Sequence, residues 1–148
     1  MTAGALTELE IISISDHGEP NRERVSIYVA DHCDLSDYCL LLGHIGVDGT
    51  TAPIKDHMLW FGYGTVNPGD WIFVYTASGS TTITPYHPFP ADTSIVHRLI
   101  SVHWGKEHTI FQNPGVVPML VRVDAAAVMA PPAPQYQGVK DGSKMRLR

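Results

Sequence analysis

Short runs of alternating apolar and polar residues follow one another along this chain, and Gly, Pro, Asn or Asp closes each run. Apolar residues seldom recur at the three- and four-residue spacing of an amphipathic helix. A two-residue alternation between such breakers is typical of half-buried β-strands. The pattern therefore predicts strands over residues 9–15, 23–30, 38–45, 57–62, 71–77, 94–104 and 116–124.

The spacing of these runs predicts an all-β fold, a single immunoglobulin-like β-sandwich of about seven to nine strands over residues 1–130. Residues 79–93 hold several prolines and no clear period, so we expect a long crossover loop there. Residues 125–130 are predicted to form a short strand or one helical turn. The Pro-rich and then basic residues 131–148 are predicted to form an extended or mobile tail.

The tripeptide Asn-Pro-Gly occurs twice, at residues 67–69 and 113–115, each time ahead of an apolar run. A phosphate-binding loop would need a following helix and converging N–H groups, and proline removes one donor. Both tripeptides precede predicted strands instead. They are interpreted as turns, the first as a type II turn with Gly69 at the position of positive φ.

Several segments resemble lamin tail domains. In that family an Asn precedes a Glu-led strand, and a loop ends in Asp-Leu-Ser/Thr-Gly-Trp/Tyr; Asn21, Glu23, Val25, Ile27, Asp34, Leu35, Ser36 and Tyr38 fit these positions. Pro68 and Gly69 match the family's turn, and residues 109–129 are similar to its next hairpin. Asp37 departs from the usual Gly, and residues 79–93 are a longer insertion. The resemblance covers residues 9–129 and implies an immunoglobulin-like sandwich, an accessory module in bacteria, and no shared active site.

Composition and charge narrow the classes of function. The chain has 148 residues, 44% hydrophobic, as in a soluble globular protein, and lacks an apolar run long enough to span a membrane. Acidic residues near the N-terminus disfavour a signal peptide, so we expect a cytoplasmic protein or a component of a larger particle. The net charge of −5 disfavours nucleic-acid binding except through a basic tail. That tail contains Lys140, Lys144, Arg146 and Arg148.

Eight histidines and two cysteines raise the question of a metal site. His32, Cys33 and His57 are the weak candidates for ligands. The spacing of Cys33 and Cys39 differs from the short C-x2–4-C spacing of structural zinc sites. We therefore expect no metal and no cofactor, and two reduced thiols, with their pairing left open.

The sequence lacks a nucleophile elbow of the G-x-S-x-G type, and neighbouring Asp-His pairs are poorly placed for a catalytic triad. Tyr86, His87 and Phe89 lie in a Pro-stiffened loop and are candidates for binding; the alternative is that Phe89 closes one end of the sandwich. The three tryptophans, at positions 60, 71 and 104, are predicted to lie in the core.

These observations favour a non-catalytic interaction or structural module with a protein partner or self-association, such as a subunit of a larger assembly. Free sheet edges, such as the strand containing Pro118, are suited to such contacts. One alternative is a metal-dependent or hydrolytic enzyme that uses the His-rich loops. Another is a glycan- or peptide-binding sandwich.

Overall fold

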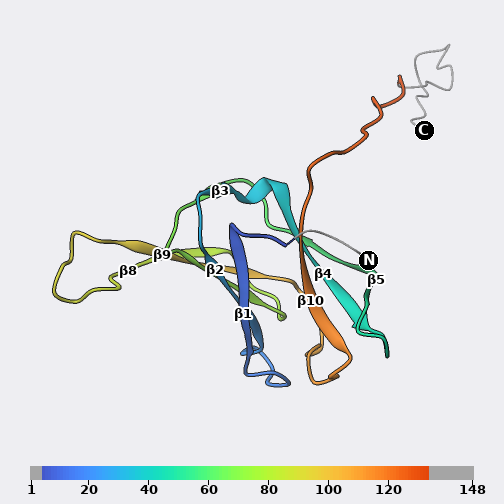
Figure 1. The fold of residues 1–148 in the computed structure, drawn as a ribbon, viewed down its shortest axis with the longest axis horizontal. Helices are drawn as coiled ribbons and strands as arrows, with labels where there is room; N and C mark the ends of the chain where they lie inside the picture. Colours follow the sequence, from blue (N-terminus) through green and yellow to red (C-terminus); the bar gives the residue numbers. More distant parts are fainter. Residues whose placement is uncertain (1–4, 134–148) are drawn as a thin grey trace, which may run out of the picture.

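The computed structural model describes residues 5–133 and is built almost entirely from β-strands (Figure 1). A single 3-10 turn, η1 (Leu35–Asp37), interrupts them. The strands are β1 (Leu9–Ser15), β2 (Arg24–Val29), β3 (Cys33–Asp34), β4 (Tyr38–Ile45), β5 (Thr51–Trp60), β6 (Thr65–Val66), β7 (Trp71–Tyr75), β8 (Thr82–Tyr86), β9 (His97–His103) and β10 (Val116–Arg122). The basic tail and the end of the Pro-rich segment lie outside the described residues.

The strands form two main sheets, which confirms the predicted all-β sandwich. One sheet has five strands in the order β1-β2-β7-β9-β8, and the other has three in the order β10-β4-β5. A short two-stranded ladder pairs β3 with β6. All pairings are antiparallel except that of β7 with β9. Figure 1 shows the three-stranded sheet on one side of the molecule and the five-stranded sheet on the other.

The core lies between these two sheets because alternate residues of each strand point inward. The buried residues that the two sheets contribute are Leu9, Val25, Ile27, Val29, Ile72, Val74, Ile100 and Val102 from the larger sheet, and Tyr38, Leu40 and Leu42 from the smaller. Each such aliphatic or aromatic side chain contributes about 1.5–3 kcal/mol when fully removed from water. The sequence alternation thus identified the core strands correctly.

Four strands differ from the prediction: β3 and β6 are short strands where none was predicted, and β5 and β8 differ in extent or in kind. Strand β5 begins at Thr51, six residues before the predicted start, and a register shift opposite Leu41 and Gly43 interrupts the alternation there. Strand β8 lies within residues 79–93, where a loop was predicted. It is an edge strand, where Pro85 is tolerated because one side of the strand needs no ladder bonds. Residues 125–130 form neither strand nor helix.

The two Asn-Pro-Gly turns differ from each other. The N–H of Asp70 donates to the carbonyl of Asn67 at 3.0 Å, and Gly69 has φ of 94°, as a type II turn requires. At the second tripeptide, Val116 N–H donates to Asn113 O at 3.1 Å, but Gly115 has no positive φ. The type II turn predicted at the first site is therefore confirmed, and the second site forms a turn without a residue of positive φ.

Glu23 is buried at the end of the sandwich and joins three segments of the chain. Its carboxylate accepts hydrogen bonds from the N–H groups of Gly18 (2.7 Å), Ile110 (2.7 Å) and Phe111 (3.1 Å) and from the hydroxyl of Thr76 (2.9 Å). These four donors offset the cost of burying a carboxylate. The β1–β2 loop, the end of β7 and the segment before β10 are thereby held together.

Within residues 5–133, no helix has the length and apolar character that crossing a membrane requires.

Candidate functional site

The outward side of the three-stranded sheet is apolar, and we refer to it as the apolar face. Cross-strand pairing places Cys39 opposite Trp60, and Leu41 opposite Met58. On the other side of β4, Met119 pairs with Leu41. Residues that point outward are Cys39, Leu41, Met58, Trp60, Val117, Met119 and Val121, because the alternating residues Leu40 and Leu42 are buried inside.

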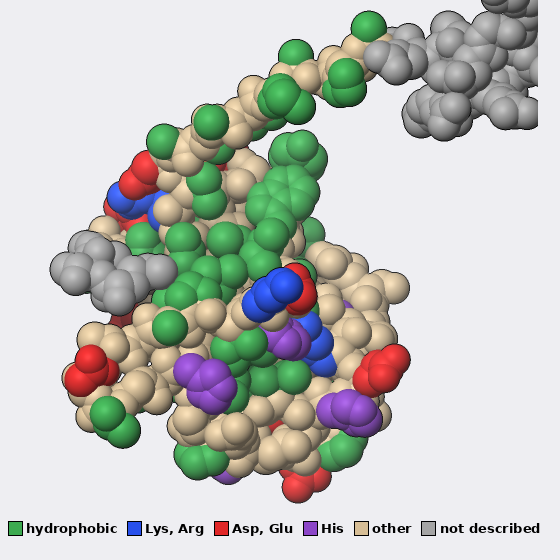
Figure 2. Space-filling view, turned by 90° about the vertical axis from the view of Figure 1, so that its right-hand side faces the viewer, with side chains coloured by type: hydrophobic (Ala, Val, Ile, Leu, Met, Phe, Trp, Pro, Cys, Tyr) green, Lys and Arg blue, Asp and Glu red, His purple; other side chains and the backbone are tan. Residues whose placement is uncertain are grey.

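The β5 side and the two ends of this face are open to solvent, whereas the side chains at its centre and on β10 are partly buried. Met58 is 58% exposed and Trp60 is 46% exposed, while Ile45 and Val123 extend the face at its two ends. None of the side chains that define the face is charged. Figure 2 looks onto this side of the molecule and shows hydrophobic side chains gathered in its upper part, with charged and His side chains below them. A one-sided antiparallel sheet normally presents polar residues to water, so an apolar outer face is an unusual feature of such a sheet.

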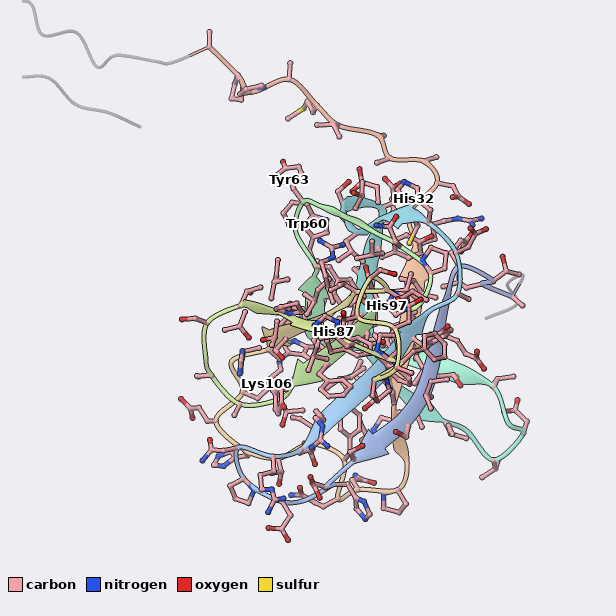
Figure 3. All side chains as sticks on the ribbon, turned by 90° about the vertical axis from the view of Figure 1, so that its left-hand side faces the viewer. His32, Trp60, Tyr63, His87, His97 and Lys106 are labelled. Carbon is pink, nitrogen blue, oxygen red and sulfur yellow. The ribbon has the colours of Figure 1, made fainter. Side chains whose placement is uncertain are left out.

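Two aromatic rings stand at the β5 end of the apolar face. The indole N–H of Trp60 donates to the carbonyl of Ser36 at 2.8 Å, which fixes the ring. The ring of Tyr63 packs edge-on against it, with centroids 4.9 Å apart, and Tyr63 is 89% exposed (Figure 3). The prediction of a core position for Trp60 is wrong, because strand parity turns this residue outward. Sequence reasoning did not identify Tyr63.

A second feature, the aromatic groove, crosses the outer face of the five-stranded sheet. It has a volume of about 390 Å3, and Trp71, Phe73, Tyr86 and Leu99 line it together with Ile12, Ser13, Ser15, Arg24 and Ser26. The Arg24 guanidinium lies 5.3 Å from the centre of the Phe73 ring. Trp71 also points outward rather than into the core, so its predicted core position is wrong. Trp104, by contrast, packs partly buried against the core.

The three predicted binding residues are only partly brought together. Tyr86 ends β8, lines the aromatic groove, and donates its hydroxyl to the carbonyl of Gly69. Burial raises the pKa of Tyr86. His87 and Phe89 follow in the β8–β9 connection, where both are exposed and neither lines the groove. Phe89 is 56% exposed, so it does not close the end of the sandwich.

The weak metal candidates lie on different elements. His32 Nδ1 is 2.8 Å from Asn67 Oδ1, whereas His57 Nδ1 is 2.7 Å from the Lys106 ammonium group. Cys33 and Cys39 are free thiols, and burial raises the pKa of both. In the described part of the chain, no group of three or more His, Cys, Asp or Glu side chains is placed to hold a metal ion.

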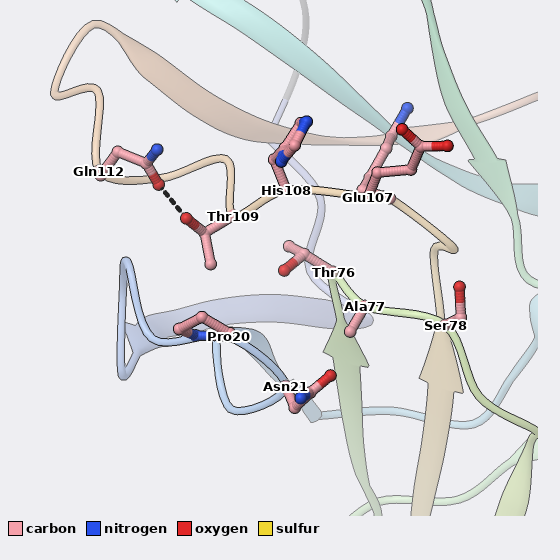
Figure 4. Close-up of a pocket in the computed structure, with 10 residues that line it drawn as sticks. Pro20, Asn21, Thr76, Ala77, Ser78, Glu107, His108, Thr109 and Gln112 are labelled. Carbon is pink, nitrogen blue, oxygen red and sulfur yellow. Dashed lines mark hydrogen bonds between the residues drawn. The ribbon is translucent and has the colours of Figure 1, made fainter.

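A polar cavity of about 590 Å3 lies at the end of the sandwich beside Glu23 (Figure 4). The β1–β2 loop, the end of β7 and residues 106–112 form its walls. Hydroxyl and amide side chains line it together with Lys106, Glu107 and His108, and Thr109 donates a hydrogen bond to Gln112 across one side. Because its lining comes from three distant segments, the sequence alone contained no signal for this cavity.

Comparison with known proteins found no match: no protein-family model matches the chain, and no match was found to a curated protein or to a solved structure. The resemblance to lamin tail domains therefore stays a prediction. The class of the protein, an all-β sandwich, rests on its fold alone.

Proposed function

We propose that this chain is a structural or interaction module, a subunit of a larger assembly that docks through the apolar face. The observation that carries the proposal is that seven apolar side chains, with no charged one among them, lie together on the outward side of the sheet, where Thr51 beside Met119 is a polar neighbour. A sandwich that worked alone would gain nothing from such a face. Its exposure to water would instead promote non-specific association.

The chemistry of the face supports docking. Removing apolar surface from water contributes about 25 cal/mol per Å2, so covering several half-exposed side chains favours association. Met58 and Met119 are flexible and adapt to the shape of a partner. Trp60 and Tyr63 are of the residue types that dominate the energetics of many interfaces.

Sedimentation of the chain in a gently prepared extract of the cells that produce it tests this proposal. The wild type is expected to sediment in an assembly larger than the monomer. The double substitution Met58→Glu and Val123→Glu places two charges on the face and should release the monomer. Both side chains are about half exposed, at 58% and 48%, so the fold should be retained.

The matched control is Val96→Glu, in the connection between β8 and β9 of the other sheet, where the side chain is 49% exposed. This variant should sediment with the wild type. Equal sedimentation of the wild type and the double variant as monomers would contradict the proposal. Unfolding temperatures of all three proteins, measured in parallel, separate lost docking from lost folding.

A second candidate function is binding of a glycan or peptide in the aromatic groove. The observation that favours it is the convergence of Trp71, Phe73 and Tyr86 on one exposed groove with serine hydroxyls at its border. Such a mixture of apolar surface and a few polar groups is common in ligand sites. Titration of tryptophan fluorescence with oligosaccharides and peptides tests it. Tyr86→Ala should abolish a response that Phe89→Ala leaves intact, whereas no response to any ligand would exclude this function.

A further inference from the structure

We infer that the occupant of the apolar face is a second copy of this chain, and that residues 125–133 of each copy lie across the face of the other. We refer to these residues as the arm. The inference rests on the proposed function and deepens it, because it identifies the partner. The inference starts from the apolar composition of the arm. The arm is not part of the core, and it begins directly beside the apolar face.

The arm is apolar throughout and makes no regular structure. Its sequence is AAAVMAPPA, without a charged or hydrogen-bonding side chain. All of its residues are exposed, and Val128 and Met129 are 89% and 83% exposed. Figure 1 shows it running away from the sandwich. A solvated linker is normally polar, so this composition indicates that the arm is covered by protein.

The root of the arm is fixed at the border of the apolar face. The arm follows β10, the edge strand that supplies Met119 and Val121 to that face. Just before the arm, Val123 N–H donates to the carbonyl of Asp37 at 2.7 Å, and Arg122 pairs with Asp124 at 2.8 Å. These contacts set the direction in which the chain leaves the sheet, and that direction leads away from its own face.

The length of the arm suits the neighbouring sheet. Nine extended residues span roughly 30 Å. The eight residues of β4, the central strand of the face, span roughly 26 Å at about 3.3 Å per residue. Pro131 and Pro132 favour an extended backbone before binding, which reduces the entropy lost on docking.

A second copy suits these surfaces better than a charged partner. The face and the arm are both uncharged, so neither offers electrostatic complementarity to an acidic or basic protein. In a two-fold dimer the arm of each copy lies on the face of the other, so the same arm–face contact is made twice. Both faces and both arms are then covered. Each arm begins at the border of its own apolar face. When the apolar faces of two copies approach each other, each arm therefore starts close to the face of the other copy.

Light scattering of the purified full-length protein over a concentration series provides the first test. The wild type should be a dimer. The double substitution Val128→Asp and Met129→Asp should raise the dimer dissociation constant by about tenfold or more, equivalent to about 1.4 kcal/mol. Because both side chains are almost fully exposed in one copy, the unfolding temperature of the monomer should not change. Val96→Asp, which adds a charge in the connection between β8 and β9, should remain a dimer.

Cross-linking provides the second test, in a Cys33→Ala and Cys39→Ala background that keeps the face apolar. One protein carries Val128→Cys and another carries Met58→Cys, and the two are mixed before a short bifunctional maleimide is added. A covalent dimer joining position 128 of one chain to position 58 of the other is expected. If a protein with both substitutions yields only cross-linked monomer, the arm covers its own face and the inference is wrong.

The remaining outcomes separate the inference from the proposed function. If the purified wild type is a monomer at all concentrations, the inference is overturned, while assembly in the cell extract would still support docking to another protein. If the arm variant dimerises as well as the wild type, the arm is not the occupant. In that case the Met58→Glu and Val123→Glu variant shows whether the face alone forms the dimer.

Discussion

The hydroxyl of Thr76 donates a 2.9 Å hydrogen bond to the carboxylate of Glu23, a residue 53 positions earlier in the chain. Glu23 is 1% exposed and Thr76 is 2% exposed, so water does not replace this bond when it is lost. The same carboxylate accepts three backbone N–H groups. One side chain therefore organises an entire end of the sandwich.

Glu23→Gln should destabilise the protein by about 3 kcal/mol or more, since hydrogen bonds to a charged group are worth about 1.5–3 kcal/mol each. Each carboxylate oxygen accepts two donors, so the amide NH2 of glutamine would face donors on one side and leave them unpaired. Thr76→Val should cost about 1–2 kcal/mol. Urea unfolding measures both effects. Glu10→Gln, at an exposed position of β1, is the control and should be nearly neutral; an equal loss there would refute the assignment.

The two Asn-Pro-Gly turns should respond differently to the same substitution. At Gly69, φ is 94° and an added Cβ would lie 2.4 Å from the His97 ring, so Gly69→Ala should cost about 2 kcal/mol or more. At Gly115 the nearest atom is Asn113 Oδ1 at 3.4 Å and φ is not positive, so Gly115→Ala should change stability by less than about 1 kcal/mol. Thermal unfolding compares them. Similar losses at both sites would mean that the turns are equivalent.

Stability should fall as the pH rises above about 8.5, the ordinary thiol pKa. Burial raises the pKa of Cys33 and Cys39 in the folded protein, so the unfolded chain loses these protons at a lower pH. The free energy of unfolding is therefore unaffected below that pH and decreases above it. Urea titrations at pH 7.5 and 9.5 measure the change. A double Cys→Ala variant should show a smaller decrease; an unchanged decrease would assign the effect to other groups.

Tyr86 and Phe89, which the sequence grouped together, should differ in their contributions to stability. Tyr86→Ala removes a half-buried ring and a hydrogen bond to Gly69, with an expected cost of about 2 kcal/mol. Phe89→Ala changes a side chain that is 56% exposed, so its effect should stay within about 0.5 kcal/mol. Differential scanning calorimetry distinguishes the two. A large loss at Phe89 would contradict its exposed placement.

Periodicity in the sequence predicted the fold well where a strand is regular. Strands β1 and β4 have the predicted bounds, and the inward parity of Val25, Ile27 and Val29 is as expected. It failed for the start of β5, where a bulge disrupts alternation, and for β8, an exposed edge strand with little apolar periodicity. Local patterns do not encode such departures.

The candidate site was harder to predict than the fold. Alternation assigns residues to two faces but does not say which face is covered, so Trp60 and Trp71 were placed in the core. The apolar face is visible only after β10 is paired with β4, because its residues come from segments far apart in the sequence. The hydrogen bonds of Glu23 are equally non-local. Glu23 is one of the positions that resemble lamin tail domains, but the resemblance does not indicate which groups donate hydrogen bonds to it.

The parallel pairing of β7 with β9 also bears on the order in which the chain folds. In the described sheet β8 contacts a strand neighbour only on the β9 side, although β8 is made earlier in the chain. Strand β8 therefore cannot pair with the sheet until β9 has docked beside β7. The docking of β9 is a non-local and hence slow event. Amino-acid changes in β8 should consequently leave the rate of refolding almost untouched and act mainly on the rate at which the native state opens.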